Sequence, residues 1–136
     1  MKHIEDPDSV QVILDANALM TAEQFGVDIF GELLRLGYVR WLVPASVMGE
    51  LESLSRNAEK GRDKVAARVA LDLAARCRIL GEDSLDADRA IEELAEETGA
   101  AVFTNDRALK KRLFSKGITV IYLRQGRYLE ATKKEY

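Results

Sequence analysis

The feature that most constrains the fold is an alternation of strand-like and helix-like segments along almost the whole 136-residue chain. Short apolar runs rich in β-branched residues are typical of buried strands, and they occur at residues 10–14, 38–44, 100–104 and 118–124. Apolar residues recur at helical spacing in residues 21–37, 46–57, 63–80, 86–99 and 106–117. Strands separated by helices predict an α/β fold, with a central parallel sheet between two layers of helices.

Length and composition fit a single globular domain, because 136 residues that are 47% apolar and 32% charged can bury a core. We place the core of this domain at about residues 10–124 and expect the polar tail, residues 125–136, to fray. The sequence contains neither a leader pattern nor an apolar run long enough to span a membrane, so we expect a cytoplasmic protein. The single cysteine, Cys77, excludes an internal disulfide, and we expect it to be a buried residue of the helix at 63–80.

Several carboxylates occur where predicted strands end. Asp15 directly follows the first strand, Glu50 lies one turn into the helix after the second, and Asp106 follows the strand at residues 100–104. Asp86 and Asp88 lie at the start of the helix that precedes the strand at residues 100–104. Because the carboxyl ends of parallel strands meet at one edge of a sheet, we expect Asp15, Glu50 and Asp106 to lie near that edge. Asp86 and Asp88 would join them if the topology brings the start of their helix to the same edge.

Converging carboxylates repel one another, which would raise the pKa values of some of them. A hard divalent cation such as Mg²⁺ or Mn²⁺ would relieve this repulsion, because these ions prefer carboxylate and water oxygens. Zinc fits poorly, since the only histidine, His3, lies outside every predicted element. Each acid also has an ordinary structural interpretation, as a helix cap, a first-turn acid or, for Glu50, a solvated side chain.

Four segments in the order LDANALM, VPASVMGELESL, DADRAIEELA and VFTNDRALKKRL resemble the PIN-domain ribonucleases, most closely the PIN nucleases of small-subunit rRNA processing. The resemblance runs from about Val10 to Arg124. It implies a PIN-like fold related to the 5′ nucleases, and an endoribonuclease that hydrolyses RNA phosphodiester bonds with Mg²⁺ or Mn²⁺.

The same resemblance implies which residues form the site. The catalytic and metal-binding carboxylates would be Asp15, Glu50, Asp88 and Asp106, with Asp86 as an alternative or additional ligand. We expect Asp88 rather than Asp86 to face inward, because it lies three residues before the apolar Ile91. The supporting polar residues would be Asn17, Thr104 and Asn105, which are otherwise ordinary turn or cap residues.

Charge is distributed unevenly along the chain. From Thr104 to the end there are nine Lys or Arg and three Asp or Glu, whereas the rest of the chain has 11 and 20. A basic C-terminal third is typical of a polyanion-binding surface, although a solvated helix face gives the same count. The cations that we expect to hold RNA phosphates are Lys110, Lys111, Arg112, Lys116, Arg62 and Lys64.

The expected partner is RNA, predicted to be single-stranded, and the resemblance also allows a homodimer. Two alternatives to an rRNA-processing nuclease remain open. One is a toxin-type PIN ribonuclease of a toxin–antitoxin pair, which would share the four acids. The other is a PIN domain that binds RNA or protein without cutting it.

Overall fold

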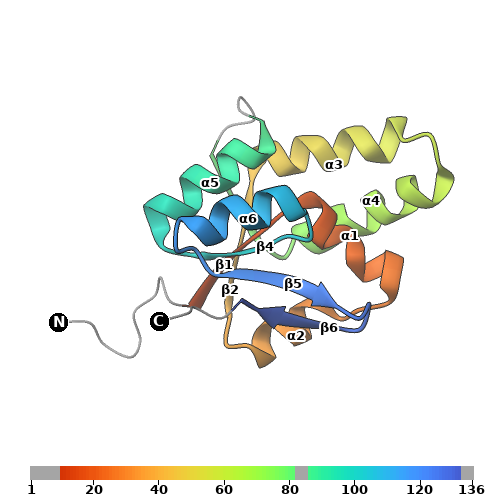
Figure 1. The fold of residues 1–136 in the computed structure, drawn as a ribbon. Helices are drawn as coiled ribbons and strands as arrows, with labels where there is room; N and C mark the ends of the chain where they lie inside the picture. The colour runs from red at the N-terminus through yellow and green to blue at the C-terminus, as the bar shows by residue number, and fades with distance from the viewer. Residues whose placement is uncertain (1–9, 82–85, 133–136) are drawn as a thin grey trace.

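The computed structural model describes residues 10–81 and 86–132, and Figure 1 shows how the elements are arranged. In chain order, the elements are β1 (Gln11–Leu14), α1 (Ala16–Phe25), α2 (Ile29–Arg35), β2 (Arg40–Pro44), α3 (Ala45–Asn57), α4 (Gly61–Ala74), β3 (Arg78–Leu80), α5 (Ala87–Thr98), β4 (Ala101–Phe103), α6 (Arg107–Ser115), β5 (Val120–Arg124) and β6 (Tyr128–Ala131). Strands and helices therefore alternate as the sequence predicts.

The strands form a single sheet in the order β3-β2-β1-β4-β5-β6. The first five are parallel, and β1 lies at the centre, where Ile13 is in register with Leu42 of β2 and Val102 of β4. Both central strands are buried, as expected when helices flank a parallel sheet. The predicted α/β fold is confirmed, and the order of the strands brings the carboxyl ends of β1 and β4 next to each other.

The flanking helices form two visible groups. Helices α1, α3 and α4 pack on one another, and α5 lies beside α6 in Figure 1. Ion pairs between the two helices, from Arg112 and Lys116 of α6 to Glu92 of α5, confirm that these neighbours in the picture are in contact. No helix in residues 10–81 or 86–132 is long and apolar enough to cross a membrane.

Residues 21–37, predicted as one helix, belong to two. Helix α1 ends at Phe25 because Gly26 adopts a left-handed conformation (φ 67°), which glycine reaches without a steric cost. Helix α2 then begins after Asp28, whose carboxylate accepts a hydrogen bond from the backbone N–H of Gly31. The break leaves Phe25 at the end of α1 with 55% of its surface exposed, whereas Ile29 and Leu33 of α2 are buried.

The predicted helix at residues 63–80 is also too long. Helix α4 ends at Ala74, and Arg78–Leu80 instead form β3, a three-residue strand at one edge of the sheet. Cys77 lies in the connection between the two and is partly buried, not within a helix as predicted. Burial raises the pKa of its thiol to about 11, so it is protonated and unreactive at neutral pH.

The polar tail does not fray where the structure describes it. After a turn in which Gln125 and Gly126 both have positive φ, residues Tyr128–Ala131 form β6, which pairs antiparallel with β5. Side chains of α2 hold this strand from the other side. The N–H of Leu129 donates to the carboxylate of Glu32 (2.9 Å), and Arg35 donates to the carbonyl of Leu129 (2.7 Å).

Candidate active site

Asp15 lies at the carboxyl end of the central strand, and only 4% of its surface is exposed. Its backbone N–H donates to the carbonyl of Phe103 (3.0 Å), which continues the pairing of β1 with β4. Its Oδ1 accepts a hydrogen bond from the backbone N–H of Ala16 (2.8 Å), so Asp15 is also the N-cap of α1. The cap interpretation and the site interpretation of this residue are therefore compatible.

A polar network holds the second oxygen of this carboxylate. The Thr104 hydroxyl group donates to Asp15 Oδ2 (2.7 Å), and the Asn17 amide donates to the same atom (3.0 Å). The Asn17 carbonyl oxygen in turn accepts from the backbone N–H of Asn105 (3.0 Å), and Asn105 Oδ1 accepts from the N–H of Leu123 (2.8 Å). These bonds link the carboxyl ends of β1, β4 and β5 into one rigid edge.

Asp106 joins this network through its backbone. Its N–H donates to the Thr104 hydroxyl oxygen (3.1 Å). The same hydroxyl group therefore bonds to the backbone of Asp106 and to the carboxylate of Asp15. The side chain of Asp106 caps α6 by accepting from the N–H of Leu109 (3.0 Å). Its fixed position at the start of α6 keeps the carboxylate beside Asp15, close enough for its charge to raise the pKa of Asp15.

Glu50 and Asp88 approach the same edge from α3 and α5. Burial raises the pKa of Glu50, and the charges of Asp15 and Asp88 raise it further. The pKa of Asp88 is raised by burial and by Asp106, while Arg112 opposes this increase. The pKa of Asp15 is raised chiefly by burial, and the hydrogen bonds from Thr104 and Ala16 oppose this increase. The four carboxylates therefore influence one another, as converging acids should.

Asp86 has a different environment from Asp88. It is exposed, and its Oδ1 accepts a hydrogen bond from the N–H of Arg89 (3.1 Å), which makes it the N-cap of α5. Asp88 lies two residues later, and it is the member of this pair whose charge acts on Asp15 and Glu50. Asp86 therefore caps the helix and its charge acts on Asp88, whereas the charge of Asp88 acts on Asp15 and Glu50.

The donor set suits a hard divalent cation. Carboxylates with raised pKa values gain most from a cation, and their oxygens match the preferences of Mg²⁺ and Mn²⁺. Within residues 10–81 and 86–132, no three Asp, Glu, His or Cys side chains lie close enough to enclose an ion by themselves. An ion that keeps several water ligands, as Mg²⁺ usually does, is compatible with such an open arrangement.

The predicted phosphate-binding cations do not share one environment. Arg112 pairs with Asp88 and Glu92, and Lys116 pairs with Glu92 and Glu96, so acids of α5 offset both charges. Lys111, which directly precedes Arg112 in α6, is exposed.

Lys110 faces β5 instead, with its ammonium group 3.6 Å from the centre of the Tyr122 ring. Arg107, at the start of α6, lines the same side of the helix as Lys110. Sequence analysis did not identify Arg107, Tyr122 or Phe25 as site residues. The signals were the position of Arg107 directly after Asp106 and that of Phe25 directly before a glycine.

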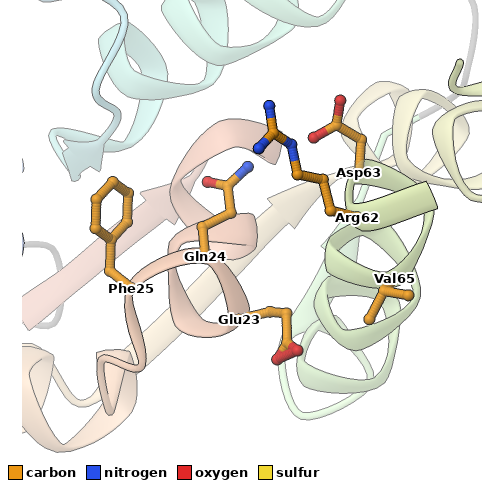
Figure 2. Close-up of a pocket in the computed structure, with 6 residues that line it drawn as sticks. All are labelled: Glu23, Gln24, Phe25, Arg62, Asp63 and Val65. Carbon is orange, nitrogen blue, oxygen red and sulfur yellow. The ribbon is translucent and has the colours of Figure 1, made fainter. Parts of the chain in front are cut away.

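Arg62 and Lys64 lie at the start of α4, away from α6 in the sequence and in the fold. Arg62 lines a hollow of about 660 Å³ between α1 and α4, together with Glu23, Gln24, Phe25, Asp63 and Val65 (Figure 2). Figure 2 shows Arg62 and Gln24 extending from the two helices into this space, while Phe25 extends away from α4. Two carboxylates among its lining residues make this hollow mixed in charge.

Residues 12–126 match the protein family described as "PIN like domain". The chain belongs to this family. The matched range includes Asp15, Glu50, Asp88 and Asp106, and it ends within the turn between β5 and β6. The family relationship suggested by the four sequence segments is thereby confirmed.

Two curated relatives of this PIN-like chain are archaeal. Ribonuclease VapC9 of Archaeoglobus fulgidus is 36% identical over 115 residues, which cover 85% of this chain and 84% of the relative. Ribonuclease VapC4 of Methanocaldococcus jannaschii is 27% identical over 124 residues, which cover 88% of this chain and 95% of the relative.

Among solved structures, the PIN domain endonuclease Utp24 is similar, with a TM-score of 0.73 and 25% identity, covering 93% of this chain and 94% of that one. A domain of a protein of unknown function from Methanocaldococcus jannaschii has a TM-score of 0.57 and 19% identity, covering 94% and 96%. The second likeness shows the fold alone.

Proposed function

We propose that this PIN-like chain is an endoribonuclease that hydrolyses RNA phosphodiester bonds with the help of Mg²⁺ or Mn²⁺. The observation that carries the proposal is the buried carboxylate of Asp15, which hydrogen bonds hold in place. The pKa values of Asp15, Glu50 and Asp88 are all raised, in part by the charges of the other acids. A cluster of this kind costs stability unless a cation neutralises it. The relatives named as ribonucleases and the neighbour named as an endonuclease support RNA cleavage.

Asp15, Glu50, Asp88 and Asp106 would hold the cation, with Asp86 acting as a helix cap and not as a ligand. When bound, a divalent ion supplies a Lewis acid that polarises the phosphate and lowers the pKa of a water molecule. Thr104 and Asn17 would keep the Asp15 carboxylate from rotating, because both donate to its Oδ2. The hydrogen bond from Thr104 also lowers the pKa of Asp15, which opposes the larger effect of burial.

Besides holding the cation, Glu50 would accept a proton from the attacking water. Among the contacts of the described residues, it is the member of the four that makes no hydrogen bond or ion pair. The raised pKa of Glu50 makes its carboxylate a stronger base, which favours proton transfer. No histidine in the described residues could take this role, because His3 is the only histidine of the chain and lies outside them.

The direct test is cleavage of an end-labelled single-stranded RNA by the purified chain in Mn²⁺ or Mg²⁺. We expect discrete internal products with the ion, none in EDTA, and none from Asp15→Asn prepared in parallel. The parallel preparation controls for a contaminating nuclease. RNA that binds but stays intact in every ion would favour the non-catalytic PIN domain instead.

The biological setting is a further part of this proposal. An rRNA-processing nuclease and a toxin-type ribonuclease would both use the same four acids, so the bound RNA has to distinguish them. Crosslinking in cells to the Asp15→Asn protein, followed by sequencing, should enrich an end of the small-subunit rRNA precursor in the first case and tRNA or mRNA in the second. We also propose a cytoplasmic homodimer, and light scattering of the purified chain tests its oligomeric state.

A further inference from the structure

A second hollow, of about 430 Å³, lies beside the candidate site on the β5 side of α6. Its lining residues come from three parts of the chain that meet there, the end of α1, the start of α6 and the β5–β6 hairpin. They include Phe25, Asn105, Arg107, Lys110, Tyr122 and Gly126. Asn105 is part of its wall and is also the residue directly before Asp106, so the hollow adjoins the acids.

The charge of this hollow differs from that of its surroundings. Arg107 and Lys110 contribute two cations, and its lining includes no carboxylate. On the opposite side of α6, the acids of α5 offset Arg112 and Lys116. The hollow between α1 and α4 combines Arg62 with two carboxylates. A further hollow, lined by Arg40, Arg76 and Arg78, also has no carboxylate in its lining, but it lies at the amino ends of β2 and β3, away from the acids. Among the basic regions on the side of the acids, the β5 side of α6 therefore offers a polyanion the strongest attraction.

Aromatic rings are the other component of the hollow. Phe25 is 55% exposed although it is a phenylalanine, and its ring lies against the hairpin turn. A methyl group built on Gly126 would come within 3.3 Å of that ring, so the glycine lets the turn approach it. Tyr122 contributes a second ring, over which the ammonium group of Lys110 is placed. An exposed ring beside cations is the combination that binds single-stranded nucleic acid.

The hollow is also held rigidly relative to the acids. Asn105 is fixed from two directions, since its N–H donates to Asn17 and its Oδ1 accepts from the N–H of Leu123. Asn17 in turn donates to the Asp15 carboxylate. A nucleotide in the hollow would therefore sit at a constant distance from Asp15, as a substrate-positioning subsite requires.

We propose that this hollow binds one nucleotide of single-stranded RNA next to the phosphate that is cut. The base stacks on Phe25, and Arg107 and Lys110 hold its phosphate groups. The proposal rests on the proposed function, because it takes RNA as the substrate. It gives the RNA a direction across the molecule, from the acids toward the β5–β6 hairpin and away from α5.

The stacking is tested by equilibrium binding of a short single-stranded RNA to the Asp15→Asn protein, which keeps the RNA intact. Replacing Phe25 by Ala should weaken binding by about 5- to 150-fold, the effect of losing one base–aromatic contact. Phe25→Trp should restore it, since a larger ring also stacks. The matched control is Phe114→Ala, because Phe114 is a similarly exposed phenylalanine (45%) of α6 outside the hollow, and binding should be unchanged.

The phosphate contacts are tested by salt dependence. The double variant Arg107→Ala/Lys110→Ala should bind more weakly and flatten the plot of log affinity against log salt by roughly 1.4, about 0.7 for each lost contact with a single strand. Arg40→Ala is the control, because it removes an exposed cation at the opposite end of the sheet. Its salt slope should equal that of the parent protein.

Failure of this proposal differs from failure of the proposed function. If wild-type protein cuts RNA while Phe25→Ala binds and cuts as the parent does, the nucleotide subsite is wrong and the nuclease stands. If the double variant alone weakens binding, the phosphate contacts hold, but the proposal of a stacked base is overturned. If wild-type protein neither binds nor cuts RNA, both proposals fall.

Discussion

The Thr104 hydroxyl group donates a 2.7 Å hydrogen bond to the carboxylate of Asp15, although the two residues are 89 positions apart in the chain. Thr104 is fully buried, and the same hydroxyl oxygen accepts from the backbone N–H of Asp106. This contact lowers the pKa of Asp15 against the larger effect of burial. One side chain thus helps to hold the central acid in position and favours its charged form.

Replacing Thr104 by Val keeps the shape of the side chain and removes the hydroxyl group. We expect the free energy of unfolding to fall by about 1–3 kcal/mol, because a buried carboxylate and a backbone N–H lose a partner. We also expect the pKa of Asp15 to rise, which moves the acidic limb of the pH–rate profile to higher pH. Urea denaturation and the pH profile measure the two effects, and Thr104→Ser, which keeps the hydroxyl, is the control. An unmoved acidic limb in Thr104→Val would contradict this role.

The variant Asp15→Asn should reduce cleavage by more than about 10²-fold, since even indirect partners of a metal ligand contribute 10- to 100-fold. The fold should persist, because Asn can still accept from the N–H of Ala16. We expect the apo variant to change little in stability, since removal of a charge that burial disfavours offsets the loss of the oxygen that accepts from the Asn17 amide. Cleavage rates and thermal melts in EDTA test both statements, and wild-type activity in the variant would refute the assignment of Asp15.

The stability of the metal-free protein should increase as the pH falls from about 7 toward 4.5. Asp15, Glu50 and Asp88 have pKa values raised above their ordinary 3.8 or 4.5, so the native state binds protons more tightly than the unfolded state. Their stabilising effect is complete below the ordinary pKa values and is lost as the pH rises through the raised ones. Glu32, whose pKa is lowered, acts in the opposite direction only at lower pH. Melting curves in EDTA check this, and a melting temperature that falls throughout this range would contradict it.

Millimolar Mg²⁺ or Mn²⁺ should raise the melting temperature by a few degrees at neutral pH. An ion at ten times its Kd adds about 1.4 kcal/mol to the free energy of unfolding, provided that it binds the native state alone. The increase should shrink in Asp15→Asn, which has one ligand fewer. Calorimetry with matched concentrations of NaCl separates specific binding from ionic strength. Equal shifts in the parent and the variant would mean that the ion binds elsewhere.

Asp86 and Asp88 should respond in opposite ways to mutation. Asp86→Ala should lower the free energy of unfolding by about 1 kcal/mol through loss of the α5 cap, with little effect on cleavage. Asp88→Ala should impair cleavage with little loss of stability. Asp86→Asn is the control, because Asn caps helices as well as Asp does. A larger loss of activity at Asp86 than at Asp88 would reverse our assignment.

Much of the fold follows from the alternation of apolar runs and amphipathic segments, which predicts the parallel strands from β1 to β5 apart from β3. The missing strands have no local signal. Arg78–Leu80 of β3 follow an alanine-rich helix after a short turn, and only three residues pair with β2. Strand β6 lies in a polar stretch whose order depends on pairing with β5 and on side chains of α2. Tertiary contacts define both strands.

The candidate site also has a part that the sequence predicts and a part that depends on tertiary contacts. The spacing of Asp15 and Asp106 after their strands predicts that they meet, because parallel strands bring their carboxyl ends to one edge. The hydrogen bonds from Thr104 and Asn17 to Asp15 could not be predicted, since they depend on side-chain orientation across three strands. The exposure of Phe25 could not be predicted from the helical spacing of residues 21–37, because Gly26 ends α1 and divides this stretch into two helices.

The ion pair of Glu32 and Arg35 has a consequence beyond holding β6 against α2. An outer strand normally presents free N–H and C=O groups, to which a strand of another molecule can add. Here the carboxylate of Glu32 and the guanidinium of Arg35 occupy the N–H and the carbonyl of Leu129, the residue in the middle of β6. A foreign strand could extend the sheet at this position only by displacing that pair. The edge beside the nucleotide hollow is in this way protected against aggregation by two side chains of a helix.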